Sequence, residues 1–197
     1  MSTQPFAGQF SIREATPADA AALLKIYEPY VRHTAITFEI TVPTVAGFRA
    51  RIASITEHYP YLVYEKIGAA AGDADSAGDA AASPQVVGYA YAHAFYGREA
   101  YRPSAETSIY LEQSMRGQGL GSALYQELEK RCQKQGITNL YACIAASRAK
   151  DSHLNDASIA FHERCGYKMV GRFEMCARKF DTWYDMVYME KFINPHN

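Results

Sequence analysis

The segment ETSIYLEQSMRGQGLG, residues 106–121, decides the fold of this chain. Its first part, TSIYL, is rich in β-branched and aromatic side chains, which predicts a strand. Its last part, RGQGLG, places three glycines directly before a helical pattern over residues 122–135. Glycine lets a ligand approach the backbone closely, and the N-terminus of a helix presents unpaired N–H groups and the positive end of its dipole. A strand, a glycine-rich turn and a helix in this order predict a site for a pyrophosphate group.

A glycine-rich turn can also be a plain connection between a strand and a helix. Two other phosphate-binding motifs do not fit. No Lys-Ser/Thr follows the glycines as in a Walker P-loop, and no hydrophobic strand with an acidic end arrives about 20 residues later as in a Rossmann unit. The pattern Arg/Gln-x-x-Gly-x-Gly/Ala after a strand instead resembles the acetyl-CoA loop of the GNAT N-acetyltransferases.

The composition of the chain points to small-molecule partners. The 197 residues suffice for one well-buried domain, and 20 basic residues against 21 acidic ones give a net charge of −1. This balance argues against a nucleic-acid or anionic-membrane partner. The first ten residues lack a basic region followed by an apolar stretch, and no apolar run approaches the length of a membrane span. We therefore expect a cytoplasmic protein.

The four cysteines, at positions 132, 143, 165 and 176, lie far apart in the sequence. Because they form no Cys-x-x-Cys pair, they suggest neither a zinc site nor a disulfide framework. The scattered histidines also lack the spacing of metal ligands. We expect buried thiols and no metal.

Hydrophobic periodicity and turn residues predict the order β, α, α, β, β, β, α, β, α, β, β. The expected strands are residues 10–15, 61–65, 86–92, 107–111, 137–146 and 180–192, with one more that starts at residues 168–171. The expected helices contain residues 22–30, 48–55, 122–135 and 155–165. Residues 68–84 are a run of Ala, Gly, Asp and Ser with almost nothing to bury, so we expect a flexible loop inserted in a hairpin. A single domain should span residues 10–193, with tails at 1–9 and 194–197.

This order of elements matches the GNAT acyl-CoA N-acyltransferase fold, an α/β fold with a central mixed, twisted sheet and helices on both faces. A second motif of that family occurs in residues 155–167, NDASIAFHERCGY. Asn155, Ser158 and His162 are spaced three and four residues apart, which predicts that they share one face of a helix. The resemblance, which covers residues 10–192, implies that this face lies beside the CoA arm.

Within the superfamily, the sequence is similar to the phosphinothricin acetyltransferase group. The matching residues are Thr37-Phe38, Arg98-Glu99-Ala100-Tyr101, Glu106, and Lys179 with Trp183 and Asp185. The sequence departs from that group in the insert at 68–84 and in a longer loop at 147–154. Because this loop borders the acceptor pocket in the family, the identity of the acceptor stays open.

The resemblance implies an N-acetyltransferase with acetyl-CoA as cosubstrate, no metal, and direct transfer in a ternary complex. The implied acceptor is the α-amine of a small amino acid or analogue, such as phosphinothricin or methionine sulfoximine. Such an amine is mostly protonated at neutral pH, so the site needs a proton acceptor. Glu106 is the candidate general base, and His162 is the candidate acid for the departing CoA thiolate. A solvated strand-end glutamate and a structural histidine are the alternatives.

Further site residues follow from the same resemblance. The candidate cofactor-binding residues are Ile109, Tyr110, Leu111, Arg116, Gly117, Gln118, Gly119, Leu120, Gly121, Ser122, Asn155 and Ser158. The candidate substrate-binding residues are Thr37, Phe38, Arg98, Tyr101, Trp183 and Tyr184. Arg98 suits an acceptor carboxylate because a guanidinium can bind it bidentately. The family also implies a homodimer. Two other functions stay open: acetylation of a protein N-terminus or another amine, and acetyl-CoA binding without turnover.

Overall fold

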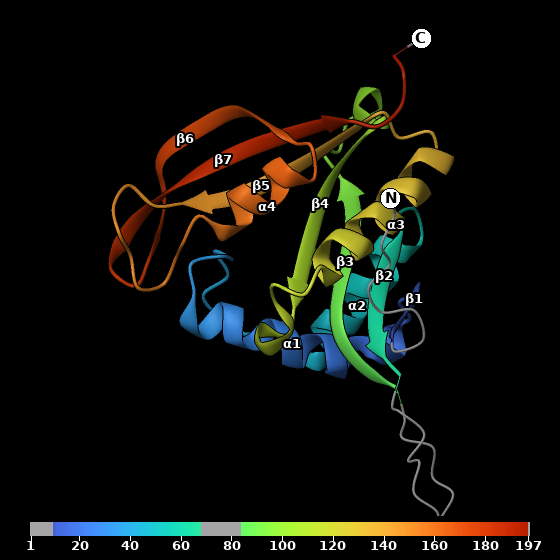
Figure 1. Ribbon diagram of the computed structural model, residues 1–197, viewed down its shortest axis with the longest axis horizontal. Helices are drawn as coiled ribbons and strands as arrows, with labels where there is room; N and C mark the ends of the chain where they lie inside the picture. Colours follow the sequence, from blue (N-terminus) through green and yellow to red (C-terminus); the bar gives the residue numbers. More distant parts are fainter. Residues whose placement is uncertain (1–9, 68–83, 197) are drawn as a thin grey trace, which may run out of the picture.

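The computed structural model describes residues 10–67 and 84–196. Except for residue 84, the predicted flexible insert lies outside the described residues, as do residues 1–9. The helices and strands follow the predicted order, and helices cover both faces of a mixed sheet (Figure 1). The predicted fold class is therefore confirmed.

Seven strands of the described chain form one sheet in the order β1-β2-β3-β4-β5-β7-β6. They are β1 (Phe10–Glu14), β2 (Tyr61–Lys66), β3 (Gln85–Ala94), β4 (Ser104–Leu111), β5 (Asn139–Ala146), β6 (Lys168–Lys179) and β7 (Thr182–Phe192). All neighbouring strands are antiparallel except β4 and β5, which run parallel. A parallel pair needs a crossover connection, and α3 (Leu120–Lys134) supplies it.

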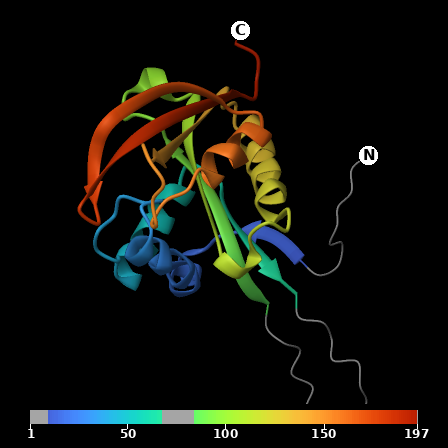
Figure 2. The same ribbon diagram turned by 60° about the vertical axis from the view of Figure 1, so that its left-hand side comes forward.

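Helices pack on both faces of this sheet (Figure 2). α1 (Ala20–His33) and α2 (Val45–Thr56) cover one face, and α3 and α4 (Ala157–Arg164) cover the other. The start of α2 is capped by the side chain of Thr44, which accepts a hydrogen bond from the Gly47 N–H at 3.0 Å. The apolar stripe predicted for α3 is confirmed, because its four members are buried: Leu120, Leu124, Leu128 and Cys132. Each buried leucine contributes roughly 1.5–3 kcal/mol to folding.

The sheet opens between β4 and β5. Three residue pairs join the two strands, from Ser104 with Asn139 to Glu106 with Tyr141, and the strands diverge beyond them. Figure 1 shows β5, β7 and β6 turning away from the half of the sheet that contains β2, β3 and β4. The C-terminal part of β4 and the C-terminal part of β5 are therefore the two walls of a cleft.

A buried carboxylate fixes the loop after β5 to the β6–β7 hairpin. Asp185 on β7 is 0 % exposed and accepts hydrogen bonds from Arg148, Arg172 and the N–H of Met175, at 3.0, 2.7 and 2.7 Å. Met175 has a positive φ of 46° and lies where β6 slips out of register with β7. Burial by itself raises the pKa of Asp185, but these three hydrogen bonds outweigh it and lower the pKa to about 2. Asp185 is thus ionised at neutral pH and holds three separate segments together.

Several sequence predictions differ from the structure. β6 starts where the sequence predicts it and continues to Lys179, an end that the sequence does not mark because most side chains of this edge strand are exposed and show no alternation. α4 begins at Ala157, so Asn155 precedes the helix and its side-chain oxygen accepts a hydrogen bond from the Ala157 N–H at 3.1 Å. The prediction of buried thiols is wrong for Cys143 and Cys176, which are exposed on strands.

Candidate active site

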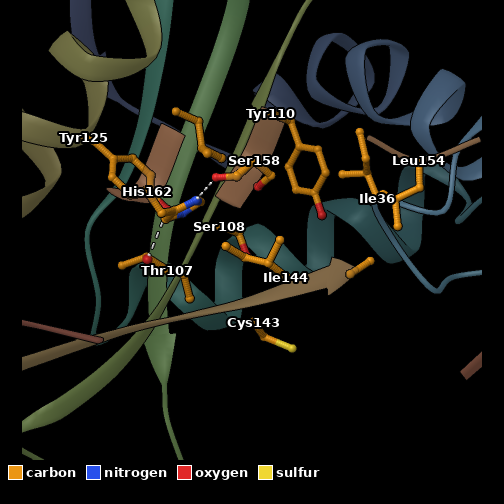
Figure 3. Close-up of a pocket in the computed structure, with 13 residues that line it drawn as sticks. Ile36, Thr107, Ser108, Tyr110, Tyr125, Cys143, Ile144, Leu154, Ser158 and His162 are labelled. Carbon is orange, nitrogen blue, oxygen red and sulfur yellow. Dashed lines mark hydrogen bonds between the residues drawn. The ribbon is translucent and has the colours of Figure 1, made fainter. Parts of the chain in front are cut away.

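The opening between β4 and β5 forms a cleft near the centre of the sheet (Figure 3). The residues that line it come from both strands, from α3 and α4, from the loop after α1 and from the loop before α4: Ile36, Thr107, Ser108, Ile109, Tyr110, Tyr125, Ala142, Cys143, Ile144, Ala145, Leu154, Ser158 and His162. Apolar side chains with a few polar groups are typical of a small-molecule site.

The backbone of β4 faces this cleft in a defined pattern. The N–H of Glu112 donates to the carbonyl of Val87 on β3 at 2.8 Å. Because backbone groups alternate along an antiparallel ladder, Tyr110 pairs with β3, whereas Ile109 and Leu111 turn their N–H and C=O groups toward β5. These two residues are therefore the positions where β4 can offer backbone hydrogen bonds to a ligand.

A tyrosine on α1 already occupies the backbone groups of one of these two residues. The hydroxyl of Tyr30 accepts from the N–H of Leu111 at 3.3 Å and donates to its carbonyl. This leaves the N–H of Ile109 as the backbone donor that β4 turns toward the cleft. The guanidinium of Arg116 lies 4.9 Å above the same tyrosine ring, which places a positive charge at the end of β4.

The glycine-rich turn has the conformation that the sequence predicts for an anion site. Gly117 and Gly119 have φ values of 76° and 81°, and Gly119 is the N-cap of α3. Leu120 and Gly121 are buried, so any contact from them to a phosphate is through the backbone. A Cβ on Gly121 would lie 3.1 Å from the ring of Phe161, which shows that this glycine allows α3 and α4 to pack closely.

Comparison with known proteins agrees with this geometry. The sequence pattern of the family described as "Acetyltransferase (GNAT) domain" matches residues 79–188. The chain belongs to the GNAT acetyltransferase family. It is 32 % identical over 186 residues to an L-methionine sulfoximine/L-methionine sulfone acetyltransferase of Pseudomonas paraeruginosa, covering 94 % of this chain and 95 % of the relative. It is 31 % identical to a phosphinothricin N-acetyltransferase of Alcaligenes faecalis, covering 93 % and 83 %.

Solved structures confirm the GNAT fold. A phosphinothricin acetyltransferase of Sinorhizobium meliloti, in complex with acetyl-CoA, superimposes with a TM-score of 0.76 at 33 % identity, covering 93 % of this chain and 88 % of that one. An N-acetyltransferase of Staphylococcus aureus gives a TM-score of 0.79 at 28 % identity, covering 95 % and 100 %.

In this GNAT chain, Glu106 stands where β4 and β5 separate. Its side chain is 19 % exposed, and the Nε2 atom of His93, directly opposite on β3, lies 3.7 Å from its Oε1 atom. Burial raises the pKa of Glu106, and the charge that His93 can carry offsets part of this rise. A half-buried carboxyl with a raised pKa beside a cleft has the properties of a general base.

His162 belongs to a chain of buried hydrogen bonds on the other side of the cleft. Its Nδ1 atom lies 2.7 Å from the carbonyl oxygen of Ser158, so Nδ1 must carry the proton. Burial lowers the pKa of His162, and its Nε2 atom lies 2.9 Å from the hydroxyl oxygen of Tyr125. The hydroxyl of Tyr125 donates to the Oγ1 atom of Thr107 at 3.1 Å. The acid role of His162 stays a prediction.

The predicted substrate residues do not all meet in one place. The rings of Phe38 and Tyr184 lie 6.3 Å apart, but Tyr184 is fully buried. The hydroxyl of Thr37 is 2.7 Å from that of Tyr27, so it points into the core. Trp183 is 54 % exposed and, as the neighbour of Tyr184 on a strand, it points to the opposite face of the sheet. These residues cannot form one aromatic pocket together.

Arg98 and Tyr101 lie in the β3–β4 connection, and Arg98 is exposed. The ring of Tyr101 is 6.0 Å from that of Phe95, which stacks on Tyr141 at 4.1 Å. Since Tyr141 is the partner of Glu106 in the β4–β5 register, these aromatic rings lie next to the candidate base. This aromatic group therefore belongs to the same side of the sheet as Glu106.

Four polar residues of the site were not predicted from the sequence: Tyr30, His93, Thr107 and Tyr125. Tyr125 could have been found, because it follows Gly121 by four residues and so shares the buried face of α3. His93 reaches the site through the register of β3 with β4, and Tyr30 reaches it through the packing of α1 on the sheet. No local sequence pattern shows either placement.

Within residues 10–67 and 84–196, no group of three or more His, Cys, Asp or Glu side chains is placed to hold a metal ion. No helix in the described ranges is long and apolar enough to cross a membrane.

Proposed function

We propose that this GNAT acetyltransferase acetylates the α-amine of a small amino acid or analogue of the phosphinothricin or methionine sulfoximine type. The observation that carries the proposal is the carboxyl of Glu106, with its raised pKa, at the point where the cleft opens. Relatives named for these acceptors support the substrate class. The aromatic rings beside Glu106 are our candidate contacts for a small acceptor, and exposed Arg98 is our candidate for its carboxylate.

In this proposal acetyl-CoA fills the β4–β5 cleft. Its pyrophosphate binds the N–H groups of the Gly117–Gly119 turn and the N-terminus of α3, with Arg116 nearby. Its pantetheine arm runs along β4 and donates a hydrogen bond to the carbonyl of Ile109. Ser158 lines the opposite wall. Acetyl-CoA in the related Sinorhizobium meliloti enzyme supports this choice of cosubstrate.

The transfer then needs one base and one oxyanion donor. The amine nitrogen attacks the thioester carbon, a C–N bond forms, and the C–S bond breaks with its electron pair leaving on sulfur. Glu106 takes the amine proton, and the N–H of Ile109 stabilises the oxyanion. A thiol has a pKa of about 8.5, so CoA can leave as a thiolate without an acid. His162, whose Nε2 atom lies 2.9 Å from the Tyr125 hydroxyl, is our candidate for protonating that thiolate.

A panel of amines tests the proposal through release of free thiol from acetyl-CoA. The panel contains phosphinothricin, methionine sulfoximine, methionine sulfone, ordinary amino acids, polyamines and short peptides. We expect turnover with the amino-acid analogues. Turnover confined to peptides or polyamines would replace the proposed acceptor, and acetyl-CoA binding without turnover of any amine would indicate a non-catalytic module.

Replacing Gly119 with alanine should weaken acetyl-CoA binding about fivefold to thirtyfold in Kd, measured by calorimetry. An alanine at φ 81° costs about 1–2 kcal/mol, so the turn relaxes and must be forced back when the pyrophosphate binds. Gly136→Ala is the matched control, because Gly136 also has φ 81° but ends α3 at the far side. It should lower stability by a similar amount and leave Kd unchanged. Equal Kd values for both variants would contradict the assignment of the loop.

We also propose a homodimer in the cytoplasm. Apolar side chains that are about half exposed gather on β6, namely Met169, Val170, Phe173 and Met175, and a partner subunit would cover them. All four cysteines are free thiols, which suits a reducing compartment. Light scattering of the purified protein and fractionation of cells check these two points.

A further inference from the structure

His93 and Glu106 face each other across the β3–β4 ladder. They are direct register partners, and their side chains approach to 3.7 Å between Nε2 and Oε1. This distance is longer than a hydrogen bond, but a small side-chain rotation closes it, and catalytic contacts often tighten only when substrate binds. The side chain of His93 is 35 % exposed, whereas that of Glu106 is 19 % exposed. The histidine therefore connects the half-buried carboxyl with the solvent.

The hydrogen bond on the other side of the ring fixes which nitrogen can take a proton. Nδ1 of His93 lies 3.1 Å from the carbonyl oxygen of Ala94. A carbonyl oxygen only accepts, so Nδ1 carries the hydrogen, and the neutral ring presents a bare Nε2 to Glu106. A carboxylate and a bare imidazole nitrogen repel each other unless one proton lies between them. The pair is thus built to hold one proton and to pass it from one atom to the other.

Acetylation of an amino acid requires the removal of two protons from the acceptor amine, which such a pair can carry out. The acceptor arrives mostly as an ammonium ion, so one proton must leave before attack and a second when the C–N bond forms. A single carboxylate can hold only one of them at a time. Glu106 must therefore release its first proton before it can accept the second.

We propose that His93 relays the proton of Glu106 to water and so returns Glu106 to its ionised form. The proton moves from the amine to Oε1 of Glu106, from there to Nε2 of His93, and then to water, and no other bond changes in these steps. This inference rests on the proposed role of Glu106 as the base. His93 does not touch the acceptor, so it is a positioning and relay residue.

Among the described residues, no cation other than His93 changes the pKa of Glu106. The titratable groups that face it are Tyr91 on β3, Cys143 on β5 and Tyr188 on β7. Desolvation raises the pKa of each of these groups, so all three stay neutral near pH 7. His93 is accordingly the neighbour whose ring nitrogen can take the proton of Glu106.

The test is His93→Gln, which keeps a polar side chain but cannot take up a proton. We expect kcat to fall about tenfold while KM for acetyl-CoA is unchanged. The acid limb of the kcat/KM profile should move to higher pH, because Glu106 loses the cation that lowers its pKa. Added imidazole should restore part of kcat in His93→Ala but none in Glu106→Gln. His58→Gln, which removes an exposed histidine after α2, is the control and should behave as the parent protein.

A second readout does not depend on turnover. Carbon-13 NMR of the Glu106 carboxyl should show a higher pKa in His93→Gln than in the parent protein. An unchanged titration would overturn the pair, and an altered titration with unchanged kcat would overturn the relay. If no amine is acetylated at all, the proposed function fails, but the NMR titration still decides whether His93 and Glu106 share a proton.

Discussion

Replacing Glu106 with glutamine should lower kcat/KM for the acceptor amine by about 10²–10⁴. Glutamine has the same shape but cannot accept a proton, so only amine molecules that are already neutral can react. The affinity for acetyl-CoA should not change, because the side chain of Glu106 lies on the opposite face of β4 from Thr107, toward the aromatic group. Steady-state kinetics together with calorimetry separate these two effects.

The control for this variant is Glu99→Gln in the same β3–β4 connection. Glu99 has a side chain that is 86 % exposed and pairs only loosely with Arg102, so we expect no loss of activity. In the parent protein the rate should rise with pH as Glu106 ionises, with a midpoint above its usual value of 4.5 because burial raises its pKa. Unchanged acetylation of every amine by Glu106→Gln would show that the base lies elsewhere.

The second large effect concerns stability. Asp185→Asn should lower the free energy of unfolding by about 3 kcal/mol, near the lower end for a broken buried ion pair because both guanidinium groups stay partly in water. An amide at this position turns an N–H group toward an arginine and leaves the Met175 N–H with a poorer acceptor. For a chain of this length the loss corresponds to a fall in Tm of roughly 6–12 °C in a thermal melt.

The pH dependence of this effect follows from the pKa of Asp185. The pKa is about 2 in the folded protein against 3.8 without the fold, so the carboxylate stabilises the protein above pH 3.8 and stops doing so as the pH falls through 2. The stability difference between parent and variant should narrow over that window. Asp181→Asn is the matched control, because Asp181 pairs with Arg178 at 3.0 Å but is 93 % exposed. A similar loss in both variants would show that burial is not the cause.

Local patterns in the sequence predict most of the fold. The glycine-rich turn, the stripe on α3 and the order of the elements follow from propensity and periodicity, which act over neighbouring residues. The end of β6 could not be predicted, because an exposed edge strand has no buried face to impose alternation. The separation of Trp183 from Tyr184 could have been foreseen, since adjacent strand residues point to opposite faces.

The site is less visible in the sequence than the fold. Glu106 was found because of the resemblance to a family, whereas the glycines are visible as a local pattern. The pairing of Glu106 with His93 depends on the register of two strands that are joined by a long connection, and a shift of one residue would separate them. The protonation state of His162 depends on Ser158 and Tyr125, and the second of these comes from another helix.

The short join between β4 and β5 bears on how long the enzyme persists in a cell. Three residue pairs hold the strands together, so the two halves of the sheet meet at a weak boundary. A ligand in the cleft touches both halves and binds only the folded chain, which stabilises it by about 2.7 kcal/mol when its concentration is 100 times Kd. Proteases cut the opened state of the chain, and the bound ligand lowers the population of that state about 100-fold. In our proposal acetyl-CoA is this ligand, so bound acetyl-CoA would slow proteolysis of the enzyme.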